Sequence, residues 1–193
     1  STKPRNDVFG TKNLKEANTK LLEIAMEDGF PPPIASRVYV YPHLAHYLTL
    51  SAFYPDSLKD ISSEINGFSK FSIDTKTEAS PELTSLLSFC NVAKKVVFSE
   101  HLMDDFKSEL LIIAKNGDLS EQSINASLVL ADTIAARLIK WISMDNYVQT
   151  RTMDRWTSSK EPGKWRETPP DYQAGLEPNW SKMRPLIIDS ANF

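Results

Sequence analysis

Apolar side chains recur at intervals of three and four residues along most of residues 12–145, and proline or glycine separates one such stretch from the next. This spacing places the apolar side chains on one face of an α-helix. Strand-like alternation and internal repeats are both absent from the sequence. The chain is therefore predicted to be all-α, a bundle of about five to six helices. Two stripes carry the pattern most clearly: Leu83, Leu86, Leu87, Cys90, Val97 and Phe98, and then Ile124, Leu128, Ala131, Ala135, Leu138, Ile142 and Asp145.

Proline and glycine mark where the first two helices should begin and end. The first helix is predicted to follow a polar N-terminal segment and to end at Asp28-Gly29. Three consecutive prolines at 31–33 suit the first turn of a second helix over 34–52, in which Pro42 is a candidate for a kink. The inner face of the first helix should carry Leu14, Leu21, Leu22, Ala25 and Met26.

Capping signals predict the remaining elements. Ser57 and Asp60 resemble a capping box, which indicates a short helix that ends at Asn66-Gly67. The polar stretch 69–80 is predicted to be a loop. Three further helices are predicted: one from Ser80-Pro81 through Phe98, one from His101 to Lys115 with a left-handed stop at Asn116-Gly117, and the longest from Ser120 onward.

The character of the chain changes at about Arg151, after which five prolines and three of the four tryptophans occur. We therefore expect residues 1–150 to form a helical bundle and residues 151–193 to form an irregular strap rich in proline and tryptophan. The strap should be ordered against a helical surface, because proline lowers the entropic cost of ordering and each aromatic has a large area to bury. The side chains expected to make this contact are Trp165, Thr168, Pro169, Pro170, Tyr172 and Trp180.

Composition excludes several classes of protein. The net charge is −3, and no Lys/Arg cluster alternates with aromatics along a face, so a nucleic-acid partner is not expected. The longest apolar runs are much shorter than the roughly 20 residues that cross a bilayer, so no membrane span is expected. A single cysteine, Cys90, excludes an internal disulfide framework and is expected to be buried in a helix.

Recognisable catalytic and metal-binding motifs are absent. His43 and His46 are three residues apart on one helical face, but zinc needs a third ligand and usually a fourth. We interpret the pair as packing or surface residues. No glycine-rich phosphate loop occurs, and acidic pairs such as Asp104-Asp105 are typical of solvated helix faces.

Two segments resemble a known family. Residues 29–41 read GFPPPIASRVYVY, and residues 162–172 read PGKWRETPPDY, followed by EPNW at 177–180. These segments are similar to the N-terminal helical region of bacterial proteins of the vanadium-dependent haloperoxidase and type 2 phosphatidic acid phosphatase superfamily. The resemblance implies two packed four-helix bundles, an oxyanion pocket for phosphate or vanadate in the C-terminal half, and an exported or periplasmic location.

The residues that form the oxyanion pocket in that superfamily are missing from this chain. They lie in KxxxxxxRP, PSGH and SRxxxxxHxxxD segments, but here no Ser-Gly-His occurs and no histidine follows His101. Arg184-Pro185 offers an RP pair, yet the lysine position is occupied by Glu177, which would repel an oxyanion. No catalytic, cofactor-binding or metal-binding residue is therefore assigned to this chain.

The resemblance implies a scaffold whose partner is a C-terminal catalytic half of the same protein. That half would carry the phosphate or vanadate pocket, and residues 151–193 would lead toward it. Inter-domain packing is accordingly assigned to the six strap residues from Trp165 to Trp180, and a second copy of the chain is a further candidate partner. Two alternatives stay open: a free-standing helical module that binds another protein through its strap, and a metal-binding helical protein that uses His43 and His46.

Overall fold

The computed structural model describes residues 9–74, 77–154 and 157–189, and this part of the chain contains helices and no strand. The all-α class expected from the sequence is confirmed. Five helices have 13 or more residues, and α6 and two 3-10 turns are shorter. The α-helices are α1 (Thr11–Glu27), α2 (Pro32–Phe53), α3 (Pro81–Ala93), α4 (Glu100–Asn116), α5 (Glu121–Ile142) and α6 (Tyr147–Thr150), and the 3-10 turns are η1 (Ser62–Glu64) and η2 (Trp180–Lys182).

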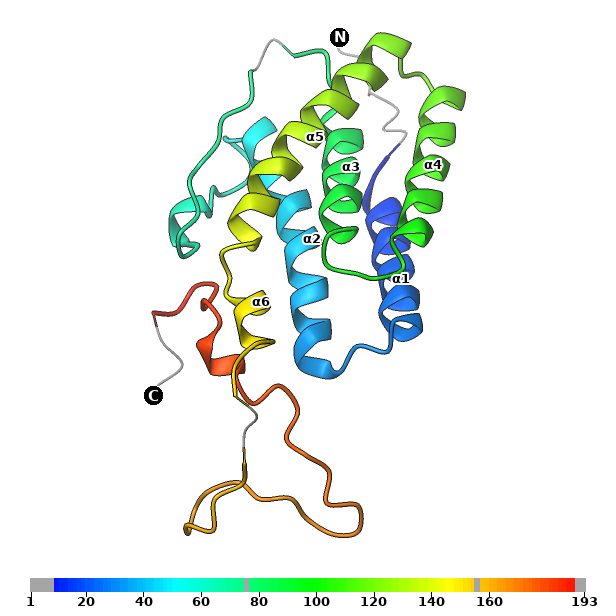
Figure 1. Ribbon diagram of the computed structural model, residues 1–193. Helices are drawn as coiled ribbons and strands as arrows, with labels where there is room; N and C mark the ends of the chain where they lie inside the picture. Colours follow the sequence, from blue (N-terminus) through cyan, green and yellow to red (C-terminus); the bar gives the residue numbers. More distant parts are fainter. Residues whose placement is uncertain (1–8, 75–76, 155–156, 190–193) are drawn as a thin grey trace.

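Helix α3 lies at the centre of the bundle, with α2 and α5 on its left and α4 on its right in Figure 1. It packs most extensively against these two helices and also contacts α1 and α4. Every residue from Leu83 to Cys90 is buried, because neighbours cover the helix on all sides. A helix that is covered all round must be apolar or small all round, as this one is.

Several helix ends follow the signals in the sequence. The hydroxyl oxygens of Ser80 and Ser120 accept hydrogen bonds from the backbone N–H of Leu83 and Ser123, at 3.3 and 3.1 Å, and so cap α3 and α5. Gly29 follows α1 with a φ of +65°, a conformation that favours glycine. By contrast, Gly117 has a φ of −93°, so the left-handed stop expected after α4 is wrong.

The helix expected to run through Phe98 ends at Ala93 instead. The Asp28 carboxylate, just beyond α1, accepts hydrogen bonds from the backbone N–H groups of Phe98 and Ser99 and so holds the turn that leads into α4. Val97 remains buried, whereas Phe98 is 77% exposed. The end of a different helix, which local sequence cannot reveal, determines this boundary.

Other local expectations also needed correction. The short helix expected after Ser57 reduces to the 3-10 turn η1. Leu22 and Met26 lie on the exposed side of α1, because the bundle covers only the opposite side of that helix. Leu128 is half-buried, although Leu86, Leu87, Ala131, Ala135 and Leu138 are fully buried as expected.

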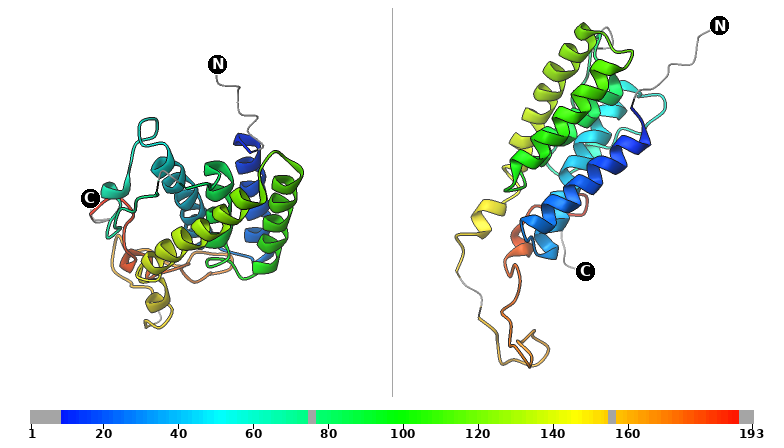
Figure 2. Two further views of the ribbon diagram at one scale, coloured as in Figure 1. Left: turned by 90° about the horizontal axis from the view of Figure 1, so that it is seen from above. Right: turned by 90° about the vertical axis from the view of Figure 1, so that its right-hand side faces the viewer.

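The segment 157–178 projects beyond the end of the bundle, below α6 in Figure 1 and away from the helices in the right-hand view of Figure 2. Trp165 is 53% exposed and Tyr172 is 62% exposed. The expected strap is therefore wrong for residues 165–172, which do not pack on a helical surface of this chain. It is right for Trp180, which is partly buried against the core where the tail returns at η2.

Candidate functional site

Asp145 lies just after α5, is 2% exposed, and forms the centre of a buried polar cluster. Its Oδ2 accepts hydrogen bonds from Arg37 Nε at 2.7 Å and from the Tyr41 hydroxyl at 2.8 Å. Its Oδ1 accepts the backbone N–H of Tyr147 at 2.9 Å, and its carbonyl oxygen accepts the backbone N–H of Arg184 at 3.0 Å. This one residue thus connects α2, the end of α5, α6 and the returning tail.

Aromatic rings hold the guanidinium groups around this carboxylate. The Cζ of Arg37 lies 4.3 Å from the ring centre of Tyr147 and 5.2 Å from that of Tyr41. Arg151 lies against the same Tyr147 ring and pairs with Glu177, near the C-terminal end of the projecting segment. Stacking on rings suits arginine, whose planar and weakly hydrated cation retains its charge when partly buried.

Arg184 is held on the indole of Trp141. Its Cζ lies 4.0 Å from the ring centre, and its Nη1 donates a hydrogen bond to the Trp141 carbonyl at 3.0 Å. Its Nη2 is buried and has no hydrogen-bond partner among the described residues. No acidic side chain in the described part of the chain forms an ion pair with Arg184.

A groove of 640 Å³ opens beside these arginines, between α2 and the returning tail. We call it the arginine groove. Its tail side carries Ile187 and Ile188, which are exposed in spite of their size. The lining residues are Ser36, Arg37, Val40, Tyr41, Trp180, Ser181, Met183, Arg184, Pro185, Leu186, Ile187, Ile188 and Asp189.

The chemistry of this cluster is that of binding rather than of proton transfer. Burial raises the pKa of Tyr41 well above its ordinary value, and the Asp145 charge raises it further, so the phenol stays protonated and acts as a donor. Arg37 is matched by Asp145, which leaves the positive charge of Arg184 unbalanced. The described lining residues include no histidine, cysteine or lysine.

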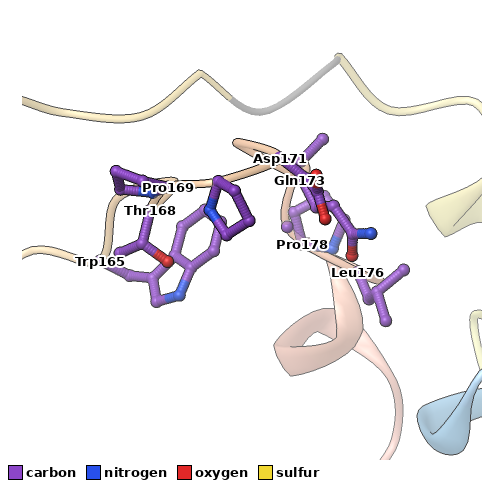
Figure 3. Close-up of a pocket in the computed structure, with 10 residues that line it drawn as sticks. Trp165, Thr168, Pro169, Asp171, Gln173, Leu176 and Pro178 are labelled. Carbon is purple, nitrogen blue, oxygen red and sulfur yellow. The ribbon is translucent and has the colours of Figure 1, made fainter.

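The projecting loop, residues 157–178, is the second candidate surface. Trp165, Thr168, Pro169 and Pro170 from the sequence prediction line a hollow of 680 Å³ together with other residues of the loop itself (Figure 3). The peptide bond between Pro169 and Pro170 is cis. Tyr172 is exposed on the same loop. These residues therefore present aromatic and proline side chains without contributing to the core of the bundle.

His43 and His46 do not converge on a shared site. His43 Nδ1 lies 2.8 Å from the carbonyl oxygen of Tyr39, and its ring makes an edge contact with Phe89. Burial lowers the pKa of His46 to about 4, and His43 lowers it as well. Within the described residues, no three His, Cys, Asp or Glu side chains are grouped as metal ligands would be.

The sequence analysis did not identify Arg37 and Tyr41 as site residues, although both lie in the 29–41 segment. Only one sign of the cluster was visible: Asp145 continues the inner stripe of α5, where an acidic residue is unexpected. Such a residue needs a cation, but the sequence does not say which of its 22 basic side chains supplies it. None of the helices in the described residues is long and apolar enough to span a bilayer.

Comparison with known proteins finds a similar solved structure. No family model and no curated protein matches the chain. Among solved structures, the crystal structure of the first bacterial vanadium-dependent iodoperoxidase is similar, with a TM-score of 0.85 and 30% sequence identity. The match covers 98% of this chain and 45% of the iodoperoxidase chain, so this chain spans less than half of that protein's length.

Proposed function

We propose, from the vanadium haloperoxidase-like fold of this chain, that it is the N-terminal helical half of a protein of the haloperoxidase and acid phosphatase superfamily. Residues 1–150 would form the scaffold bundle, and residues 151–193 would lead to a C-terminal half that carries the oxyanion pocket. The observation that best supports this proposal is the extent of the match, which spans nearly all of this chain and under half of the iodoperoxidase.

The described residues do not fit a vanadate or phosphate site. Such a site needs several cations and amide donors around the oxyanion, together with a histidine that attacks phosphorus or ligates vanadium. Here Arg37 is already matched by Asp145, Arg184 is stacked on Trp141, and no histidine lies in the arginine groove. Any halide oxidation or phosphate hydrolysis is accordingly assigned to the C-terminal half.

The projecting loop supports a role in packing against that half. Large exposed side chains gather on it, including Trp165, Tyr172 and Leu176. An exposed group of this kind is typical of a surface that another domain or protein covers. The same loop, together with Trp180 at its base, carries the six residues to which inter-domain packing is assigned.

The proposal is tested by comparing this chain with a longer protein that includes the residues following Phe193. We expect backbone amides of the projecting loop to exchange with deuterium at least about tenfold more slowly in the longer protein, because the second half would cover them. Helix α4 serves as the internal control, since its exchange should be unchanged. Equal exchange of the loop in both proteins would overturn the proposed packing.

A matched pair of variants sharpens this test. In the longer protein, Trp165→Ala should restore fast exchange in the loop and reduce turnover, because it removes a large aromatic contact. Phe98→Ala removes an aromatic of similar size that is exposed at the start of α4, and it should alter neither readout. If the two variants behave alike, the loop is not the inter-domain contact, and a free-standing module that binds another protein becomes the better account.

A further inference from the structure

The proposed scaffold role does not account for the positive charge and the apolar wall of the arginine groove. Arg37 is paired with Asp145 and Arg151 with Glu177, whereas Arg184 has no carboxylate partner among the described residues, so the cluster has an excess of one positive charge. Asp189 lies at the exposed rim and forms no ion pair with either arginine in the described part of the chain. The unbalanced cation is Arg184.

Arg184 also lacks a hydrogen-bond acceptor. Its Nη1 is used by the Trp141 carbonyl, whereas its Nη2 is buried with no partner among the described residues. A buried donor without an acceptor is unfavourable, and a guanidinium pairs best with a planar carboxylate. An anionic group that entered the groove would supply the missing charge beside the Arg184 guanidinium.

Most of the remaining wall of the groove is apolar. Val40 lies on α2, Met183 and Pro185 lie on the returning tail, and Ile187 and Ile188 extend the apolar wall toward the rim. The volume of 640 Å³ falls within the range of about 300–1,000 Å³ typical of small-molecule sites. The groove thus combines the Arg184 cation with a mainly hydrocarbon wall.

We propose that the arginine groove binds a small amphiphilic carboxylate. Arg184 pairs with the carboxylate, and Met183, Ile187 and the neighbouring apolar side chains contact the hydrocarbon chain. No covalent step is involved. The proposal does not require the inter-domain packing proposed above, because every lining residue of the groove belongs to this chain.

Decanoate is the probe, and isothermal titration calorimetry on the 193-residue chain is the measurement. We expect decanoate to bind at least about tenfold more tightly than decyltrimethylammonium, which has the same chain length and the opposite charge. Arg184→Gln should weaken decanoate binding by about tenfold or more, because it removes the charge-assisted pair. Equal binding of the two amphiphiles would overturn the proposal.

A second variant covers the case in which Arg184→Gln fails to fold. Ile187 is exposed at the groove, so Ile187→Asp should fold normally and should weaken decanoate binding through repulsion and the loss of apolar contact. Val129→Asp introduces the same charge on the exposed face of α5 and should leave decanoate binding unchanged. Equal loss in both aspartate variants would mean that the effect is not local, and the proposal would fail.

The longer protein decides the source of the carboxylate. Retained decanoate binding there, still sensitive to Ile187→Asp, would support a free ligand. Loss of binding would mean that a segment of the protein fills the groove, which overturns the free-ligand proposal while leaving the inter-domain packing intact. Slow exchange of the projecting loop without decanoate binding would mean that only the groove proposal fails. Decanoate binding with unchanged loop exchange would mean that only the inter-domain packing fails.

Discussion

Asp145 and Arg37 show how two buried charges can be tolerated in a small helical bundle. Their side chains are 2% and 10% exposed. Each charged group has further partners besides the other. The carboxylate also accepts hydrogen bonds from Tyr41 and from the backbone of Tyr147, while the guanidinium lies against the rings of both tyrosines. The desolvation cost of each charge is offset only while this complete arrangement is present.

Removing the negative charge of Asp145 should therefore destabilise the protein strongly. Asp145→Asn leaves the Arg37 guanidinium buried without its counter-charge, and we expect the free energy of unfolding to fall by about 3–5 kcal/mol. Urea denaturation followed by circular dichroism measures the change. Asp118→Asn, at an exposed position between α4 and α5, should change the same quantity by less than about 0.5 kcal/mol. A loss under about 1 kcal/mol for Asp145→Asn would show that the pair contributes little.

His46 should make stability depend on pH. Its folded-state pKa is about 4, below the ordinary value of 6.5, because burial disfavours the charged ring. As the pH falls through 6.5 the unfolded chain takes up a proton first, so stability that is fully present above pH 6.5 is lost between pH 6.5 and about 4. The loss should not exceed roughly 3 kcal/mol. His46→Gln should flatten this part of the stability profile in urea titrations, and His101→Gln, at an exposed position, should not.

At the scale of elements, α5 shows how a sequence stripe and a buried face can differ. Leu138 is fully buried against the neighbouring helices, whereas Leu128, on the same stripe, is only half-buried. Helix α5 crosses the bundle over α3, so its inner face is buried to different depths along its length. A helical period indicates which side faces inward, but not how far each neighbour extends along it.

Two alanine substitutions on α5 should lower the free energy of unfolding by different amounts. Leu138→Ala should lower the free energy of unfolding by about 2–5 kcal/mol, because it loses transfer energy and creates a cavity. Leu128→Ala should cost less than about 2 kcal/mol, since solvent already reaches part of the side chain. Denaturant titration of both variants provides the comparison. A cost for Leu128→Ala that equals that of Leu138→Ala would contradict the burial seen along α5.

At the scale of the whole molecule, the bundle and the tail differ in how they are stabilised. The bundle has a continuous core that extends from α1 to α5. The Arg151–Glu177 pair joins the two ends of the projecting loop, and contacts of η2 with α6 and of Arg184 with Asp145 attach the returning tail to the bundle. Between Arg151 and Glu177 the loop has little of its surface buried. This arrangement makes the loop available to a partner without disturbing the core.

The purified 193-residue chain should show no turnover. We expect neither hydrolysis of p-nitrophenyl phosphate nor peroxide-dependent iodide oxidation in the presence of vanadate, because this chain has no lysine, arginine and histidine set for an oxyanion. An active acid phosphatase and an active vanadium haloperoxidase serve as the positive controls. Turnover by the 193-residue chain that a single substitution abolished would show that an active site exists within these residues.

The sequence by itself determined the class of the fold and the location of most helices. Ser80, Ser120 and Gly29 act through hydrogen bonds and backbone angles within a few residues, so their effects can be read locally. The stripes of α3 and α5 likewise indicate which side of each helix faces the core. The resemblance carried by residues 29–41 and 162–180 predicted the haloperoxidase-like fold, which the comparison with the iodoperoxidase confirms.

Only the tertiary structure decided which distant residues meet. Arg37 and Asp145 are 108 positions apart, and Asn66 and the tail are joined by contacts across more than 110 positions. The end of α3 depends on a carboxylate at the end of α1, and the exposure of Trp165 and Tyr172 depends on where the tail is attached. Local periodicity cannot encode these pairings, because buried charges and loops are placed by packing between helices rather than by the residues beside them.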